Sequence, residues 1–395
     1  MDEPTKRTTT TTQLACIGLL AMGVLGAAWR AGKEVAIGDV AWELPVTLAP
    51  PSGFDLPTAI EALPVSGDQV PSVHAVSAIA TPDGGLRAYW FGGSREGASD
   101  VGIWTAALPP NGTSWSGQQV AIDRPTTEDE LNRHIRKLGN PVAFARGNVV
   151  DLFYVSVSAG GWSGSAINAA RSEDGGIHFG TPERLVTSPV ANISTLVKAP
   201  PIAYQDGSIG LPVYHEMVAK FPQLIRIQPD TGEVVGRQTF AGGPETIQPW
   251  IVVLDATRAV ALLRRIEPDE PSVHISRTDD GGKTWSAPSP IGLPNPNASV
   301  AALHLGGNSI LMAYNHSEEK RNDLSLARSD DGGLSWNRLG AVETNKRHPD
   351  ESDKVDFPKL EYSYPWLVPD QRGGIHLLYT WNRKQIRHLR IPAQP

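Results

Sequence analysis

The sequence predicts an all-β fold of the β-propeller class. Apolar residues make up 40% of the chain and charged residues 19%, a balance typical of a globular protein. Glycine, proline and tryptophan are abundant, with 39, 33 and 11 copies, which suits many short strands joined by turns. From about residue 71, short apolar runs alternate with clusters of Gly, Asp, Pro or Asn about every eight to twelve residues, and no long helical period interrupts them.

A repeated turn supports the propeller and gives its blade length. The pattern occurs at Ser172–Phe179, Thr278–Trp285 and Ser329–Trp336. The second and third copies start 51 residues apart and the first and second 106 apart, which fits one and two four-stranded blades. Residues 71–395 then hold about six blades, which hide their strand edges by radial repetition. The turn aspartates can bond the backbone of their own loop, so we expect a structural role for Asp174, Asp280 and Asp331.

The N-terminal segment differs from the rest of the chain. Leu14–Trp29 carries no charge, while Lys6 and Arg7 precede it and Arg30 follows it. We therefore expect residues 1–33 to form a hydrophobic helix that acts as a signal peptide or signal anchor. Sixteen residues is short for a membrane span of about 20, so cleavage and retention both stay open. The protein would be periplasmic, extracellular or anchored through residues 14–29.

Several classes of site are excluded or expected to be absent. The Pro-rich stretch 34–70 shows no clear period and is expected to be a linker. The net charge of −7 argues against a nucleic-acid partner. Cys16 is the one cysteine, so no disulfide framework can form. No histidine spacing suits zinc and no phosphate-binding loop occurs, so we expect no metal and no cofactor.

The repeated turn resembles the Asp-box of sialidases and their relatives, and the resemblance covers most of residues 71–395. It implies a six-bladed propeller of the sialidase type. In that family three arginines hold the carboxylate of an acidic sugar, a tyrosine assisted by a glutamate is the nucleophile, and an aspartate is the acid/base. A neutral tyrosine suits this chemistry because the substrate carboxylate would repel a carboxylate nucleophile. Arginine suits the clamp because its planar fork binds a carboxylate through two bonds.

Four segments resemble the family's site segments. The segment "FGGSREGASD" places Arg95 as a pocket arginine and Asp100 as the acid/base, with Glu96 as its rival. The segment "IQPWIVVLDATRAVALLRR" places Arg264 as the second arginine of the clamp and Gln248 at the position of the helper glutamate.

The remaining two segments lie nearer the C-terminus. The segment "EEKRNDLSLARSDDGG" points to Arg321 as the third arginine. The segment "YSYPWLVPDQRGGIHLLY" points to Tyr364 as the nucleophile, with Tyr362 as its neighbour. Weaker candidates for the pocket wall are Lys198, His215, Glu216, Asn297, Asn382 and Arg383.

Two positions depart from the family pattern. His74 stands where the first arginine of the clamp is expected, and Gln248 cannot act as a base. A site with two arginines and His74 still suits an acid, best when the histidine is protonated. The departures indicate a divergent branch of the family.

The resemblance implies an exo-α-sialidase-like glycoside hydrolase that removes a terminal acidic sugar from a glycan. Asp100 or Glu96 would donate the proton and Tyr364 would attack. Two alternatives stay open. The chain could be a non-catalytic glycan-binding propeller, or another polysaccharide-acting enzyme such as a lyase, with His74 as base and Tyr364 as acid. Convergence of these residues in one central pocket separates a specific site from scattered surface positions.

Overall fold

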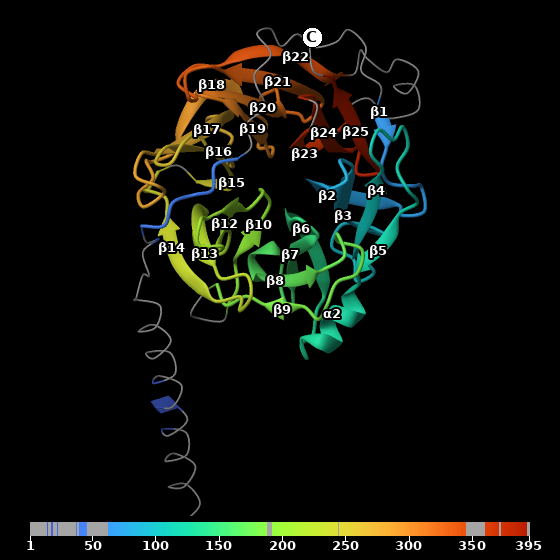
Figure 1. Ribbon diagram of the computed structural model, residues 1–395. Coiled ribbons are helices and arrows are strands. Elements are labelled where there is room, and N and C mark those ends of the chain that lie inside the picture. Colours follow the sequence, from blue (N-terminus) through green and yellow to red (C-terminus); the bar gives the residue numbers. More distant parts are fainter. Residues whose placement is uncertain are drawn as a thin grey trace, which may run out of the picture.

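Six β-sheets are arranged in a ring around a central axis in the computed structural model (Figure 1). The structure describes residues 62–187, 192–243, 245–344, 360–370 and 373–392, together with residues 37 and 39–45 and the isolated residues 14, 17, 18 and 22. The six sheets confirm the six-bladed all-β propeller that the turn spacing predicts.

Blades 1 to 3 follow one another along the chain, each numbered from its innermost strand. Blade 1 contains β2 Ser72–Ala80, β3 Leu86–Gly93, β4 Gly102–Leu108 and β5 Gln119–Ile122. Blade 2 contains β6 Lys137–Arg146, β7 Val149–Val157, β8 Ser165–Ser172 and β9 Glu183–Arg184, and a short helix, α2 Arg124–Glu130, precedes it. Blade 3 contains β10 Leu196–Val197, β11 Ile202–Ala203, β12 Ile209–His215, β13 Phe221–Ile227 and β14 Val234–Thr239.

Blades 4 to 6 complete the ring. Blade 4 contains β15 Thr246–Val253, β16 Ala259–Arg265, β17 Ser272–Thr278 and β18 Ser289–Pro294. Blade 5 contains β19 Ala301–Gly306, β20 Ser309–Asn315, β21 Asp323–Ser329 and β22 Asn337–Thr344. Blade 6 contains β23 Tyr362–Pro369, β24 Ile375–Trp381 and β25 Gln385–Ile391, with β1 Ala62–Pro64 as its outer strand.

The ring closes through β1. This strand pairs antiparallel with β25, with Ala62 opposite Leu389, so a strand from before blade 1 completes blade 6. It lies inside the stretch 34–70 that the sequence indicates as a linker. Trp42 in the same stretch is 1% exposed, and the Glu43 amide donates to the Ala203 carbonyl of blade 3. These parts of the expected linker therefore pack on the propeller, β1 through its pairing with β25 and Trp42 through its burial.

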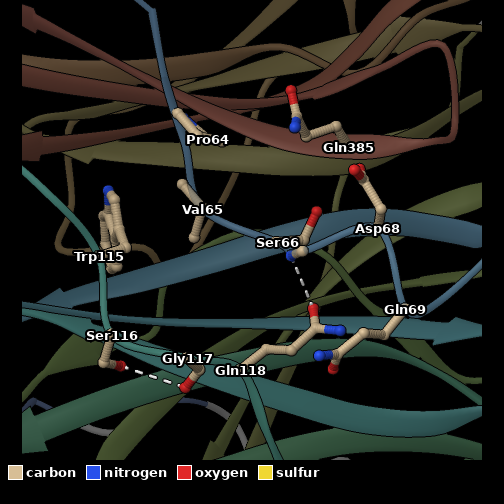
Figure 2. A pocket seen from close by; sticks show the side chains of 11 residues that line it. Pro64, Val65, Ser66, Asp68, Gln69, Trp115, Ser116, Gly117, Gln118 and Gln385 are labelled. Carbon is tan, nitrogen blue, oxygen red and sulfur yellow. Dashed lines mark hydrogen bonds between the residues drawn. The ribbon is translucent and has the colours of Figure 1, made fainter.

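An outer groove of about 380 Å³ marks the seam between blade 6 and blade 1. Figure 2 shows Trp115 and Gln118 of blade 1 on one side of it and Val65 on the other. The Gly67 amide donates to Gln118 Oε1 at 3.0 Å and ties the two sides together. None of the predicted site residues lines this groove, so it belongs to the closure of the ring.

The repeated turns join the third and fourth strands of blades 2, 4 and 5. In the last copy, Asp331 Oδ1 accepts bonds from the Leu334 and Ser335 amides, both at 2.9 Å. Each turn also meets a neighbouring blade, as where Tyr89 Oη of blade 1 donates to the Gly176 carbonyl of blade 2. The prediction of a structural role for the turns agrees with these bonds, since they fix the loop and join adjacent blades.

The expected N-terminal hydrophobic helix is not supported. Most of residues 1–33 lie outside the described residues. Within the part of the chain that the structure describes, no helix has the length and apolar character needed to cross a membrane.

Candidate active site

One cavity of about 280 Å³ receives side chains from all six blades. Its walls carry a large share of polar and charged groups, which is typical of a site for a polar ligand. The lining residues are His74, Phe91, Glu96, Asn140, Trp162, Leu196, Tyr214, Glu216, Gln248, Arg264, Arg321, Tyr364 and Arg383.

Most of the predicted site residues converge on this cavity, and two do not. The ones that line it are His74, Glu96, Gln248, Arg264, Arg321 and Tyr364. Asp100 is exposed and accepts bonds from the Ser94 amide and hydroxyl, both at 3.0 Å, so it fixes the loop after β3. Arg95 in the same loop is also exposed. Of the three charged residues predicted there, only Glu96 reaches the cavity.

A repeated β-bulge aims several of these side chains at the cavity. The innermost strands of blades 1, 2, 4 and 6 each hold one extra residue against the second strand. A bulge re-aims a side chain, and the left-handed backbone of its non-glycine residues is strained. The extra residues all have positive φ: Ala75 at 53°, Asn140 at 43°, Gln248 at 56° and Tyr364 at 52°.

Proline follows three of these bulge residues, at Pro141, Pro249 and Pro365. Proline has no amide to donate to the ladder, so within a sheet it is tolerated at a bulge. The recurring X-Pro pair at the start of inner strands is the signal by which sequence reasoning could have found Asn140.

An arc of three arginines spans blades 4, 5 and 6. Arg264 lies near the end of β16, Arg321 in the β20–β21 loop and Arg383 in the β24–β25 turn. Arg264 Nε donates to Asn297 Oδ1 at 2.5 Å, and Arg321 Nη2 donates to the Asn297 carbonyl at 2.7 Å. Asn297 lies just before β19, the innermost strand of blade 5, and its backbone also has a positive φ, of 51°. One residue between blades 4 and 5 therefore sets the spacing of two guanidinium groups.

Glu361 binds two of the three arginines, Arg321 and Arg383. Its carboxylate accepts from Arg321 Nη1 at 3.2 Å and from Arg383 Nε at 2.9 Å. Burial acts to raise the pKa of Glu361, but the hydrogen bond and charge of Arg383, helped by Arg321, outweigh it and lower the pKa to about 2. Glu361 is thus ionised and fixes the two arginines. It was not among the candidates from the sequence, because nothing in its segment marks it out.

His74 packs edge-on against Tyr364, with ring centroids 4.4 Å apart and an interplanar angle of 71°. Burial lowers the pKa of His74 well below its usual range, and the positive charges of Arg383, Arg321 and Lys198 lower it further. The imidazole is therefore neutral at neutral pH. The expectation that protonated His74 completes the clamp does not fit this environment, and Arg383 supplies the third cation.

Gln248 bridges two polar side chains at the position expected for the helper glutamate. Its Oε1 accepts from Arg264 Nη1 and its Nε2 donates to Tyr214 Oη, both at 3.4 Å. Burial raises the pKa of Tyr214, so its phenol stays protonated. The amide orients Arg264 but offers no proton acceptor for Tyr364.

Two further carboxylates, those of Glu96 and Glu216, line the cavity. Glu96 forms an ion pair with Arg383. Glu216 follows β12, and burial raises its pKa while Arg264, Lys220 and Lys137 act to lower it. Among the described residues no group of three or more His, Cys, Asp and Glu is arranged to hold a metal ion.

Lys198 is a buried lysine next to the site. It is 2% exposed, and burial lowers its pKa to about 7. Its Nζ lies 5.4 Å from the ring centroid of Tyr364 and 4.9 Å from that of Trp366. No described residue accepts a hydrogen bond from Nζ, so aromatic faces are its main stabilising contacts.

Comparison with known proteins agrees with this architecture. The model of the BNR repeat-like domain family matches residues 84–377. Among solved structures, a Hadza microbial sialidase is 16% identical, with a TM-score of 0.65 over 86% of this chain and 71% of its own. A protein of unknown function from Dyadobacter fermentans is 14% identical, with a TM-score of 0.67 over 85% of this chain and 98% of its own.

A leech intramolecular trans-sialidase complexed with 2,7-anhydro-Neu5Ac is 13% identical, with a TM-score of 0.62 over 85% of this chain and 70% of its own. No curated protein matches the sequence at a significant level. The structural likenesses concern the fold, while the family model covers most of the sequence. The chain belongs to the BNR repeat-like domain family.

Proposed function

We propose that this protein is an exo-α-sialidase-type glycoside hydrolase that removes a terminal acidic sugar from a glycan. The observation that carries the proposal is the arc of Arg264, Arg321 and Arg383, which shares one cavity with Tyr364. A cavity of about 280 Å³ is at the small end of ligand sites, which favours one terminal sugar over an internal chain segment.

The arginine arc suits the carboxylate of such a sugar. Guanidinium groups bind carboxylates through paired, charge-assisted bonds, and here Asn297 and Glu361 hold them in place before a ligand arrives. Preorganised cations lose little freedom on binding, so more of the interaction energy appears as affinity. Arg383 replaces the arginine that is missing at position 74.

Tyr364 would attack the anomeric carbon as the bond to the leaving group breaks. The phenol proton must go to a base, and His74 is neutral and in contact with the Tyr364 ring. In the proposed first step the phenol oxygen bonds the sugar, His74 takes the phenol proton, and a carboxyl group gives a proton to the leaving oxygen. Water then attacks the sugar, the carboxylate takes the water proton, and the phenol recovers its proton from His74.

Hydrolysis of a fluorogenic α-sialoside tests the proposal. The wild-type protein should release the fluorophore, and Tyr364→Phe should lower kcat by at least about 100-fold. Tyr362→Phe is the matched control and should keep its activity, because Tyr362 does not line the cavity. Absence of turnover on every acidic glycoside, with tight binding of the free sugar, would favour the glycan-binding alternative.

A lyase is the second candidate, and the contact between His74 and Tyr364 favours it. A neutral histidine next to a tyrosine can supply the base and the acid of a β-elimination, while the arginines hold the substrate carboxylate. Elimination leaves an unsaturated sugar that absorbs in the ultraviolet, whereas hydrolysis does not. Product analysis of one uronate-containing polysaccharide and one sialoside separates the two reactions.

The location of the protein is proposed on its N-terminal sequence. The uncharged run at residues 14–29, between basic residues, supports export to the periplasm or the cell surface, with the segment cleaved or retained as an anchor. Fractionation of cells expressing the full chain, followed by N-terminal sequencing of the mature protein, tests both points.

A further inference from the structure

The two glutamates that line the cavity, Glu96 and Glu216, lie differently with respect to the arginine arc. Neighbouring blades contact one another in chain order, and blade 6 returns to blade 1, so blade 3 lies across the axis from blade 6. The three arginines come from blades 4, 5 and 6. Glu96 comes from blade 1 and Glu216 from blade 3. Glu96 therefore lies beside Arg383, with which it pairs, whereas Glu216 lies on the blade across the axis from Arg383.

The carboxylate of Glu96 is engaged with the arginine arc. It is ion-paired with Arg383, whose guanidinium also binds Glu361. Glu96 thus helps Glu361 to hold Arg383 in the arc, and protonating it would break that ion pair.

Glu216 is held in place through its backbone while its carboxylate is left available. The amides of Glu216 and Met217 donate to Ser194 Oγ at 3.0 and 2.8 Å. The backbone of Ser194 is in the left-handed region, with a φ of 69°, where it makes these bonds. Among the described residues, none makes a hydrogen bond or ion pair to the Glu216 carboxylate, which is partly buried in the cavity wall.

We propose that Glu216 is the acid/base residue of this site, which gives its proton to the leaving oxygen and later takes a proton from water. The inference rests on the proposed function. In the first half-reaction the bond from the anomeric carbon to the leaving oxygen breaks, and the Glu216 proton moves to that oxygen. In the second, water attacks the anomeric carbon, the bond to the Tyr364 oxygen breaks, and Glu216 recovers a proton.

The electrostatic setting of the two carboxyl groups agrees with this division. Burial raises the pKa of Glu216, against the opposing effects of Arg264, Lys220 and Lys137, and so favours its protonated form relative to an exposed glutamate. Two carboxylates with different environments in one site are the usual basis for separate acid and ionised roles. The loop of blade 1, where sequence resemblance places the acid/base, supplies the ion-paired residue.

Leaving-group dependence tests the assignment, with Glu96→Gln as the matched control. Glu216→Gln should lose about 100-fold or more in kcat/KM on an alkyl or sugar leaving group, but much less on a nitrophenyl glycoside, whose leaving group needs little protonation. Glu96→Gln should lower kcat/KM by the same factor on both substrates, because Glu96 acts through Arg383.

The outcomes separate this inference from the proposed function. If the wild type hydrolyses acidic glycosides and Glu216→Gln affects both leaving groups equally, the assignment of Glu216 is overturned while the hydrolase stands. If Glu96→Gln shows the leaving-group dependence, Glu96 is the acid and the assignment is again wrong. Absence of any wild-type turnover overturns the function and the assignment together.

A second measurement needs no substrate. An infrared difference spectrum between the wild type and Glu216→Gln isolates the carboxyl band of Glu216. This band should show a protonated acid at pH values above about 4.3, the usual pKa of glutamate. A purely structural glutamate on the surface would be ionised there, and that result would contradict the inference.

Discussion

The imidazole of His74 packs edge-on against the ring of Tyr364, with ring centroids 4.4 Å apart, and each of their strands has a β-bulge next to this contact. His74 is at the position where the family's first arginine is expected, yet burial and three nearby cations keep it neutral. The contact therefore replaces two expected features at once. In the proposed mechanism Arg383 takes over the charge, and His74 is the proton acceptor that Gln248 cannot be.

Replacing His74 should reduce the chemical step and leave binding largely intact. His74→Phe keeps an aromatic ring against Tyr364 but removes the proton acceptor, so kcat should fall by about 100-fold while KM changes little. Because the pKa of His74 is held well below 6.5, the wild-type rate should stay high as the pH falls through 6.5. A kcat–pH profile checks both points, and an unchanged kcat in His74→Phe would contradict the role.

Replacing Arg383 should weaken the recognition of a substrate carboxylate. Arg383→Lys keeps a cation but loses the paired bonds to a carboxylate, at a cost of about 1.5–3 kcal/mol, or roughly 10- to 100-fold in kcat/KM. The same variant should bind a methyl ester of the sugar about as well as the wild type does. Calorimetric titration with acid and ester measures this, and equal losses for both ligands would argue against a carboxylate clamp.

The repeated turns should matter for stability and not for catalysis. Asp331→Ala removes the acceptor for the Leu334 and Ser335 amides and should lower the free energy of unfolding by about 1–2 kcal/mol. The activity of the folded protein should be unchanged, because Asp331 does not line the cavity. Urea denaturation followed by tryptophan fluorescence measures the loss, and a drop in kcat without a loss of stability would contradict the structural role.

A histidine pair in blade 6 should make the closure of the ring sensitive to acid. His388 Nδ1 accepts from Trp115 Nε1 at 3.3 Å, and its Nε2 bonds His376 Nδ1 at 2.8 Å, which requires both rings to be neutral. Burial lowers the pKa of His376 to about 4 and that of His388 to about 3. The unfolded chain therefore binds more protons below about pH 6.5, and stability should fall as the pH drops from 6.5 towards 4.

The matched test compares His376→Gln with His134→Gln. His134 is exposed, with 74% of its side chain accessible, and pairs only with the surface residue Glu128, so its replacement should change the pH dependence much less than that of His376. His376→Gln should flatten the fall in melting temperature between pH 6.5 and 4. Identical pH profiles for the wild type and His376→Gln would show that the pair does not control the closure.

The sequence predicted the propeller because the repeated turn is a local device. Its aspartate and glycines act within a few residues, and their spacing gives the blade length directly. The closing strand β1 was missed because three residues in a Pro-rich stretch carry no period, and only β25 makes them a strand. Asp100 was predicted in the site by its place in a loop, but that loop turns it to Ser94 and leaves Glu96 facing the cavity.

The supporting residues of the site were harder to predict. Glu361 and Asn297 act by holding arginines from other blades, and no local pattern encodes contacts that the ring creates. Arg383 was a weak candidate because it lies in a hairpin turn, where an arginine is usually exposed. The X-Pro pairs at the inner strands are a local signal that can be read from sequence, since each marks a bulge that faces the cavity.

Covalent trapping of Tyr364 tests the central claim most directly. A 2,3-difluoro derivative of the acidic sugar forms the first bond readily and loses it slowly, so incubation followed by proteolysis and tandem mass spectrometry locates the adduct. The account predicts one added sugar on Tyr364, none on Tyr362 and none in Tyr364→Phe. An adduct on another residue, or turnover with an unsaturated product and no adduct, would contradict it.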